Sequence, residues 1–246
     1  MKTFLEYKYN TVVLSISMFF NDLFWIFFYW ILFNQAGSIN SWVFADSIML
    51  FGVTTFSYGL SVLFFYNWNY IHSIVLTGKL DYFLLKPIDP LFHVLINRST
   101  FTAFGELLMG FACFLFVYGL SISHFLLFVF FSITATLLYT ATQVLVSCLV
   151  FYVGRSSEIV NSFQMGFLTF TMYPTHIYSG ITKIILYTVF PAFFISTLPV
   201  ELLRDFNIVW CLGIVLFTLF YCSAVYFIFN KGLKNYESGN LVLVNV

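Results

Sequence analysis

Long, mostly apolar runs of residues constrain this chain more than any other feature. Each is about 20 residues long or longer, the length that a helix needs to cross the hydrocarbon core of a bilayer. They cover Thr11–Phe33, Asp46–Tyr66, Thr100–Leu120, Phe125–Tyr152, Ser157–Pro174 and Ile208–Phe229. Outer-membrane barrels are instead built from alternating segments of about 10 residues. The runs therefore predict an all-α, polytopic membrane protein with six transmembrane helices.

Composition favours the same class. Of the 246 residues, 61% are hydrophobic and only 8% are charged, whereas soluble domains carry about 25% charged residues. The net charge is zero, so we expect no nucleic-acid partner, which would require a basic field. No soluble segment or low-complexity tract interrupts the pattern, and residues 1–246 are interpreted as a single transmembrane domain in contact with membrane lipid.

A further apolar stretch, Ile177–Leu203, contains Pro191 and Pro199. Proline inside a helix removes a backbone hydrogen bond and clashes with the preceding turn. In a membrane such a break needs protein or water around it. We therefore expect an external re-entrant hairpin of two short helices before the sixth span, and not a seventh span.

Positively charged residues predict the orientation, because they concentrate in cytoplasmic loops. With a cytoplasmic N-terminus and six spans, the cytoplasmic basic residues are Lys2, Lys8, Lys79, Lys86, Arg98, Arg155, Lys231 and Lys234. Only Lys183 and Arg204 fall outside. A seventh span would change this split only slightly, so the prolines decide between the two topologies. The expectation is a multi-pass protein of a bacterial-type cytoplasmic (inner) membrane, with both termini in the cytoplasm.

The longest loop, Asn67–Ser99, lies on the predicted cytoplasmic side. Within it, Ile71, Ile74 and Val75 recur at helical spacing and form one apolar face of a short helix. Gly78 suits the C-terminus of that helix. Such a helix either docks on a soluble partner or rests on lipid headgroups, and the spacing does not separate these two roles.

Polar residues form one stripe in each of two predicted spans. The stripes are Ser132, Thr136, Thr140, Gln143 and Ser147 in the fourth span, and Ser157, Asn161, Gln164 and Thr171 in the fifth. Such faces either pack helices against one another or line a translocation route. Packing is the commoner use.

Two acidic residues fall inside predicted spans: Asp22 in the first and Glu106 in the third. A carboxylate at the bilayer centre costs about 2.5–3.5 kcal/mol on insertion scales. Something must offset that cost. The two candidate roles are a structural hydrogen bond within the bundle and a functional role in substrate contact or gating.

Histidines and cysteines are scattered, so we expect neither a metal site nor catalytic residues. The residues concerned are His72, His93, His124, His176, Cys113, Cys148, Cys211 and Cys222. A phosphate-binding G-x-x-x-x-G-K-[ST] loop is absent from the sequence as well.

Three runs in the sequence match a known pattern in order and spacing. They are Gly78-x-Leu80-Asp81-x-x-Leu84-Leu85-Lys86-Pro87, then Tyr173-Pro174-x-x-Ile177-Tyr178 with Phe190-Pro191-Ala192 and Pro199, and Lys231-Gly232-Leu233-Lys234-Asn235-Tyr236-Glu237-Ser238. Together they resemble the type-2 export permeases of ATP-binding-cassette (ABC) transporters. The similar group works with a separately encoded ATPase. Lys86 departs slightly, because many relatives carry Arg there.

The resemblance implies six spans, a cytoplasmic docking helix between spans two and three, and an external re-entrant pair before span six. It also implies separate ATPase subunits and a second permease copy or a related permease as partners. The implied docking residues are Ile71, His72, Ile74, Val75, Gly78, Asp81 and Lys86. Since this chain lacks a nucleotide-binding loop, we expect it not to be an enzyme and to bind no cofactor, with ATP and Mg²⁺ on the partner ATPase.

Two other functions remain open from the residues alone. An ion-coupled secondary transporter would use midplane charges, for which Asp22 and Glu106 are the candidates. A non-transporting membrane scaffold would keep the helical bundle but have neither nucleotide coupling nor a polar route. The hydroxyl and amide stripes favour an amphipathic or hydrophobic substrate for an exporter.

Overall fold

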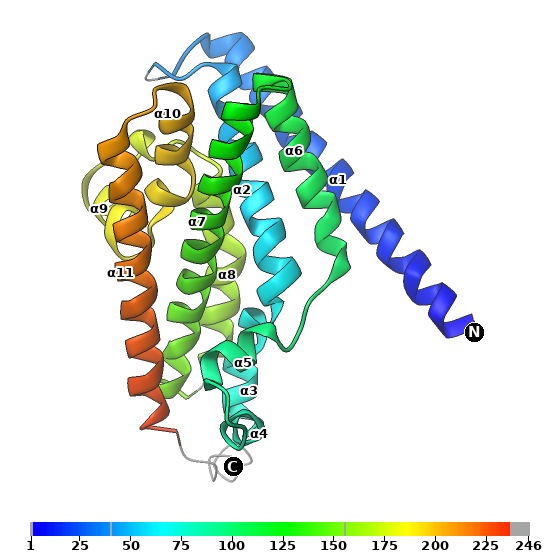
Figure 1. Cartoon of the computed structure of the whole chain (residues 1–246), viewed down its shortest axis with the longest axis vertical. Helices are drawn as coiled ribbons and strands as arrows, with labels where there is room; N and C mark the ends of the chain where they lie inside the picture. The colour runs from blue at the N-terminus through cyan, green and yellow to red at the C-terminus, as the bar shows by residue number, and fades with distance from the viewer. Residues whose placement is uncertain (1, 40, 155, 237–246) are drawn as a thin grey trace.

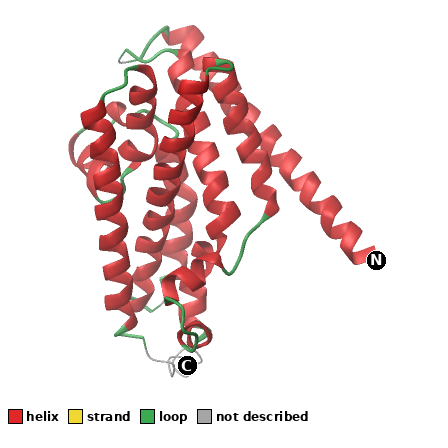
Figure 2. Cartoon of the chain, in the orientation of Figure 1, coloured by secondary structure: helices red, strands yellow, loops and turns green. Residues whose placement is uncertain are grey.

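The computed structural model describes residues 2–39, 41–154 and 156–236, and throughout these ranges the regular elements are helices (Figure 2). This confirms the predicted all-α class. The long helices are α1 (Lys2–Ala36), α2 (Phe44–Phe65), α6 (Phe104–Tyr118), α7 (Ile122–Ser147), α8 (Ser157–Thr171) and α11 (Ile208–Leu233). The short ones are η1 (Tyr66–Tyr70), α3 (Ile71–Leu76), α4 (Leu80–Leu84), α5 (Pro90–Ile96), η2 (Phe101–Ala103), η3 (Cys148–Phe151), η4 (Thr175–Ile177), α9 (Gly180–Thr188), η5 (Phe193–Thr197) and α10 (Leu198–Arg204). Of the C-terminal motif, Glu237 and Ser238 lie outside the described residues.

Four helical segments among the described residues are long and apolar enough to cross a membrane. They are Val12–Ala36, Phe44–Leu76, Ile122–Phe151 and Ile208–Leu233. α6 and α8 have 15 residues each, fewer than the about 20 that a span normally needs. The protein is therefore a multi-pass membrane protein, and the full count of six spans stays a prediction.

The long helices lie roughly along one axis and alternate in direction along the chain (Figure 1). α1, α6 and α8 run towards one end of the bundle, and α2, α7 and α11 run back. The end that carries η1, α3, α4 and α5 is called the loop end below. The opposite end, with η4, α9, η5 and α10, is called the hairpin end. α1 begins on the loop-end side, where the described chain also finishes after α11.

α2 occupies the centre of the bundle. In an apolar stretch of 18 residues within its segment, 67% of the residues are buried, against 11% in the corresponding stretch of α1. On one side α2 packs against α6, where a Cβ atom added to Gly110 would lie 2.7 Å from the carbonyl oxygen of Gly52. Small residues of this kind let two helix backbones touch. On its other side α2 packs against α7.

The stretch predicted to be a hairpin is broken into two helical pieces. α9 ends at Thr188, η5 begins at Phe193, and the two pieces are bent by 63°. Pro191 lies in that break. Pro199 does not: it lies just after the turn η5, inside the helical piece that runs on from Phe193 to Arg204. Both a broken span and a re-entrant loop fit this shape, so the re-entrant hairpin stays a prediction.

Candidate functional site

The predicted docking helix is present, but its apolar face turns inward. α3 spans Ile71–Leu76, and Gly78 follows it with a φ of 70°, as a glycine after a helix C-terminus commonly does. Ile71, His72 and Val75 are each at most 7% exposed. They are covered by this chain itself, because α3 packs against η3 and α7. Three of the four predicted docking residues on α3 are thus covered by the chain itself, and Ile74 alone of the apolar face is partly exposed. Their docking role stays a prediction.

Exposed apolar residues of the loop end lie on α4 and the turn after it, and also on α5, η2 and the start of α6. Leu84 is 41% exposed and Leu85 is 85% exposed. Lys86 is exposed too, and its Nζ donates a hydrogen bond of 2.7 Å to the Oη of Tyr82. Two of the motif leucines, which do not belong to the apolar face of α3, are thus among the apolar residues exposed here.

Asp81, another predicted docking residue, is partly buried in the first turn of α4. It lies next to Tyr236, which follows α11 near the end of the described chain. Burial, together with the negative charge of Asp81, raises the pKa of Tyr236 to about 12. Tyr236 of the C-terminal motif therefore lies beside Asp81 at the loop end.

The polar stripe of α7 lies in the contact with α2. Thr136 donates to the backbone oxygen of Ser57 at 3.2 Å, and the hydroxyls of Thr140 and Ser61 are 2.7 Å apart. Further along, the indole Nε1 of Trp68 donates to Ser61 at 3.1 Å. All five stripe residues, Ser132, Thr136, Thr140, Gln143 and Ser147, are at most 5% exposed. In this conformation the stripe joins helices.

The shorter stripe of α8 is divided between interior and surface. Gln164 is buried and its Nε2 donates to the hydroxyl of Ser147 at 3.4 Å, which links α8 to α7. Asn161, one turn away, is partly exposed. The two predicted stripes therefore meet at Ser147 and Gln164.

The two intramembrane acids lie together. Asp22 of α1 and Glu106 of α6 are 4% and 9% exposed, and their carboxyl groups lie next to each other. Two carboxylates buried side by side repel each other when both are ionised, and burial disfavours the charge on each. The second oxygen of Asp22, Oδ2, is buried without a hydrogen-bond partner among the described residues.

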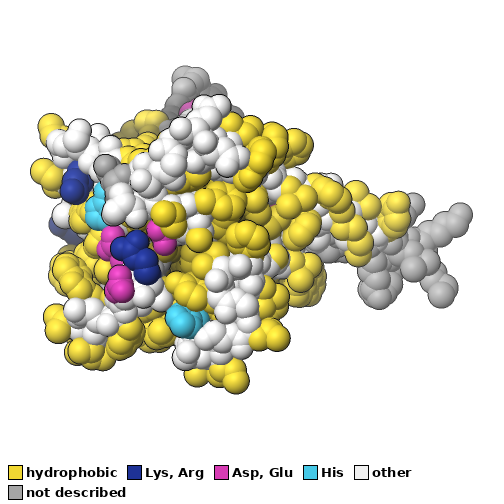
Figure 3. All heavy atoms as spheres, turned by 90° about the horizontal axis from the view of Figure 1, so that it is seen from above, with side chains coloured by type: hydrophobic (Ala, Val, Ile, Leu, Met, Phe, Trp, Pro, Cys, Tyr) yellow, Lys and Arg dark blue, Asp and Glu magenta, His cyan; other side chains and the backbone are white. Residues whose placement is uncertain are grey.

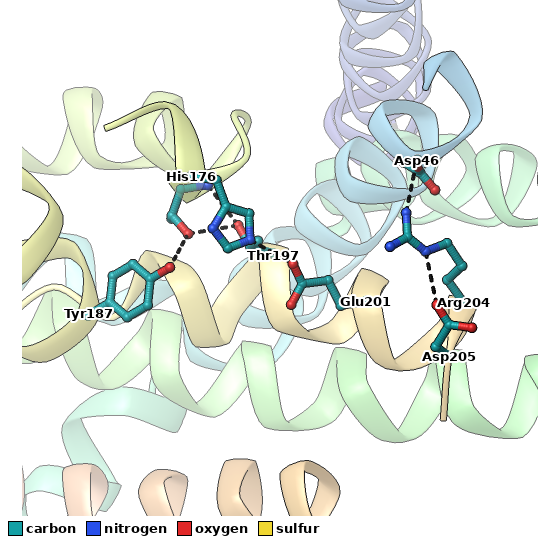
Figure 4. Close-up of polar contacts among 8 residues, drawn as sticks. Asp46, His176, Tyr187, Thr197, Glu201, Arg204 and Asp205 are labelled. Atoms are coloured by element: carbon teal, nitrogen blue, oxygen red, sulfur yellow. Dashed lines mark hydrogen bonds and ion pairs between the residues drawn. The ribbon is translucent and has the colours of Figure 1, made fainter. Parts of the chain in front are cut away.

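A charged cluster at the hairpin end was not predicted from the sequence. Seen onto this end, basic, acidic and histidine side chains gather near the middle of a largely hydrophobic outline (Figure 3). His176 Nε2 lies 2.6 Å from Glu201 Oε1, and Arg204 contacts Asp46 at 3.4 Å and Asp205 at 3.3 Å. Figure 4 shows that these contacts join α10 to η4 and to the start of α2.

Buried hydroxyls reinforce that cluster. Thr197 is fully buried in η5, and its Oγ1 accepts the backbone N–H of Thr175 at 3.0 Å (Figure 4). The hydroxyl of Thr175 lies 3.2 Å from the same atom. One signal in the sequence could have pointed here: in a chain with so few charges, Asp46 and Arg204 both border predicted spans on the same side.

Among the described residues, no three His, Cys, Asp or Glu side chains are grouped so that they could hold a metal ion. The arrangement is that of a helical membrane bundle with an apolar exterior, a hydroxyl-lined interior contact and structured loops at both ends.

Comparison with known proteins gives one match. Residues 19–239 match the family described as ABC-2 family transporter protein. Neither a curated protein nor a solved structure matches the chain. Permeases of this family are the membrane components of transporters and typically pair with ATP-binding subunits. The match covers most of the 246 residues, and the chain therefore belongs to the ABC-2 transporter family.

Proposed function

We propose that this chain is the membrane-spanning permease subunit of an ABC exporter, in which a separate subunit hydrolyses ATP. The family match over residues 19–239 is the observation that carries the proposal. The chain would pair with a second copy or a related permease, bind no cofactor itself, and lie in a bacterial-type inner membrane with both termini in the cytoplasm. The substrate would be amphipathic or hydrophobic.

The ATPase would dock on the surface formed by Leu84 at the end of α4 and by Leu85 and Lys86 in the turn after it. Two of these residues are exposed leucines, and Lys86 adds a positive charge to which an acidic group of a partner can bind. α5 would link this surface to the bundle, because α4 packs against α5, which packs in turn against η1 and α2. A push on α4 would then reach the bundle through a packed core, which transmits strain because it is dense.

The test is co-purification of the chain with its ATPase, followed by an ATP-hydrolysis assay in lipid. Leu85→Ser should weaken association about 30-fold, because truncating an interface hot spot costs about 2 kcal/mol. Leu120→Ser is the matched control, since Leu120 is 91% exposed but lies between α6 and α7 at the opposite end. Equal association of both variants with the ATPase would reject this docking surface. Failure of the wild-type chain to bind any ATPase would reject the exporter.

A translocation route along the α7 stripe is testable separately. Thr140→Leu should impair transport before stability if the stripe opens to the substrate during the cycle. If the hydroxyls only join helices, the larger side chain should lower the unfolding midpoint first, because overpacking a core costs about 1–3 kcal/mol. Transport and unfolding measured on the same variant separate these outcomes.

The carboxyl pair favours a second candidate, an ion-coupled secondary transporter. A pair of buried carboxyl groups in the α1–α6 contact, Asp22 and Glu106, is the kind of feature that such transporters use. In this case transport by reconstituted protein would follow an imposed proton gradient without ATP and would stop in Asp22→Asn. Transport that needs ATP and persists in Asp22→Asn would leave the pair with a structural role.

A further inference from the structure

A small pocket opens at the loop end, separate from the surface on α4. Its volume is about 160 Å³, large enough for a phosphate-sized group. It is lined by Asn67, Tyr70, Ser73, Ile74, Lys79, Phe83, Asn97 and Arg98. These residues come from η1, α3, α4, the turn before α4 and the segment before η2. The pocket therefore lies where the chain leaves α2 and where it enters α6.

The lining is cationic. Lys79 and Arg98 are its charged members, and no acidic residue lines it. Within the described part of the chain, neither cation forms an ion pair. The Arg98 guanidinium stands 4.6 Å from the ring centre of Tyr70, a cation–π contact that holds it in place and leaves its N–H groups available. Ser73, which is exposed, adds a hydroxyl donor.

Contacts with α5 hold two of the lining residues in place. Asn67 is 1% exposed and its Nδ2 donates to the backbone oxygen of Val94 at 2.7 Å, which ties η1 to α5. Phe83, 5% exposed, packs edge-on against the ring of His93 at 4.9 Å between ring centres. A cationic pocket with such a preformed wall loses little conformational freedom when an anion binds.

The surface beside the pocket is suited to lipid. Phe101 and Phe104 follow Arg98 by three and six residues, are 58% and 46% exposed, and stack with their rings nearly parallel. They belong to η2 and the first turn of α6, which is a predicted span. Apolar rings that face outward next to a cation at the end of a span mark the boundary between acyl chains and headgroups.

We propose that this pocket binds the phosphate group of a membrane lipid, with Lys79 and Arg98 as the binding cations and the acyl chains along Phe101 and Phe104. Arginine binds phosphate through two parallel N–H bonds, and lysine binds it as a point charge. Basic pockets between membrane helices on the cytoplasmic side are suited to anionic headgroups. The site does not depend on the docking of an ATPase, so it can fail or stand separately from the proposed function.

The occupant is a lipid phosphate and not an acidic side chain of a partner protein, because the exposed rings continue the site towards the membrane. Free phosphate shares the same charges but has nothing to place against those rings. Binding of a phospholipid should therefore be much tighter than binding of inorganic phosphate. A lipid without a phosphate group, such as diacylglycerol, should not bind.

The experiment is native mass spectrometry of the full-length chain in detergent, titrated with phosphatidylglycerol. The wild-type chain should retain one phosphatidylglycerol more firmly than any other lipid. The double variant Lys79→Gln with Arg98→Gln should lose at least about tenfold in affinity, as expected for removing hydrogen bonds to a charged group. The matched control is Lys231→Gln with Lys234→Gln, which removes two basic residues of the same end outside the pocket and should bind as the wild type does.

Two competition measurements decide the source of the bound phosphate group. Diacylglycerol should not displace the bound lipid, and inorganic phosphate should displace it only at much higher concentration. Equal displacement by inorganic phosphate would mean a free-phosphate site and would overturn the proposal. Unchanged lipid binding in the Lys79→Gln, Arg98→Gln variant would also overturn it. The proposal would also be overturned if the double variant kept the lipid but lost a co-purifying ATPase, because the pocket would then be part of the ATPase-binding surface. Because Lys79 and Arg98 are exposed, the variant should fold, which its unfolding midpoint checks.

Discussion

The two ends of the bundle use their charges in opposite ways. At the hairpin end, Arg204 contacts Asp46 and Asp205, and His176 contacts Glu201, so the charges there join parts of the same chain. At the loop end, Lys79 and Arg98 form no ion pair with a described residue. Hydrogen bonds tie that end together instead, as in those from Asn67 to the backbone of Val94 and from Tyr226 to Asp89.

This difference teaches where to look for recognition in a membrane protein with few charges. A charge that is already paired is mainly structural, whereas an unpaired cation in a preformed pocket is available to something outside the chain. The hairpin end is thus a candidate for fixing the fold, and the loop end for contact with lipid and a partner subunit. Four substitutions test this contrast, each read as a change in the thermal unfolding midpoint in detergent.

The largest effect should come from Thr197→Val at the hairpin end. Valine keeps the shape but leaves the buried N–H of Thr175 without its acceptor, which should cost about 1–3 kcal/mol. For a chain of this size each kcal/mol lowers the midpoint by about 2–4 °C. Thr188→Val is the control, because Thr188 is exposed and its hydroxyl bonds only within α9. A similar fall of the unfolding midpoint in both variants would show that the hydrogen bond between Thr175 and Thr197 adds no particular stability.

A smaller loss, about 1 kcal/mol, is expected for Asp46→Ala. Asp46 accepts the N–H of Val43 at 3.0 Å, which caps the start of α2, and it pairs with Arg204. Asp205→Ala removes a carboxylate that contacts the same arginine but is 83% exposed, and it should change the midpoint little. If Asp205→Ala is the more damaging of the two, the cap is not what Asp46 contributes.

Glu201→Gln should cost less than about 1 kcal/mol, since its contact with His176 is about one third exposed on both sides. The amide keeps a hydrogen bond and removes the charge. Because salt screens exposed charges, the difference from wild type should shrink at high ionic strength. The loss in Thr197→Val should not shrink. A salt-independent effect of Glu201→Gln would mean that the charge does not matter here.

The smallest effect should be that of Lys79→Gln at the loop end, within about 0.5 kcal/mol of wild type. Lys79 is exposed and makes no ion pair with a described residue, so its removal should leave the fold unchanged while weakening lipid binding. Destabilisation as large as that of Thr197→Val would erase the contrast between the two ends.

Helix positions were largely predictable from the apolar runs, but helix orientation was not. The spacing of Ile71, Ile74 and Val75 correctly predicted a short helix, while its apolar face proved to be buried in the chain's own core. In a membrane protein the core, the lipid and a partner interface are all apolar surroundings. Periodicity locates the face of a helix, and it does not tell which of these three covers it.

The polar positions show the same limit at longer range. The stripe of α7 was visible from its spacing, but its partners Ser57 and Ser61 on α2 lie 79 residues away in the chain. The contact between Asp46 and Arg204 spans 158 residues. Local patterns cannot pair residues at such distances, because the pairing is set by how whole helices pack and not by the sequence around either residue.

Lipid beside α6 meets a helix of only 15 residues. At 1.5 Å per residue α6 is about 22 Å long, whereas the hydrocarbon core of a typical bilayer is about 30 Å thick. If α6 crosses the membrane, either the bilayer around it becomes thinner or the flanking η2 turn lengthens the apolar segment. Each Å of remaining mismatch costs a fraction of a kcal/mol. A locally compressed leaflet next to the permease would shorten the distance that an apolar substrate has to travel.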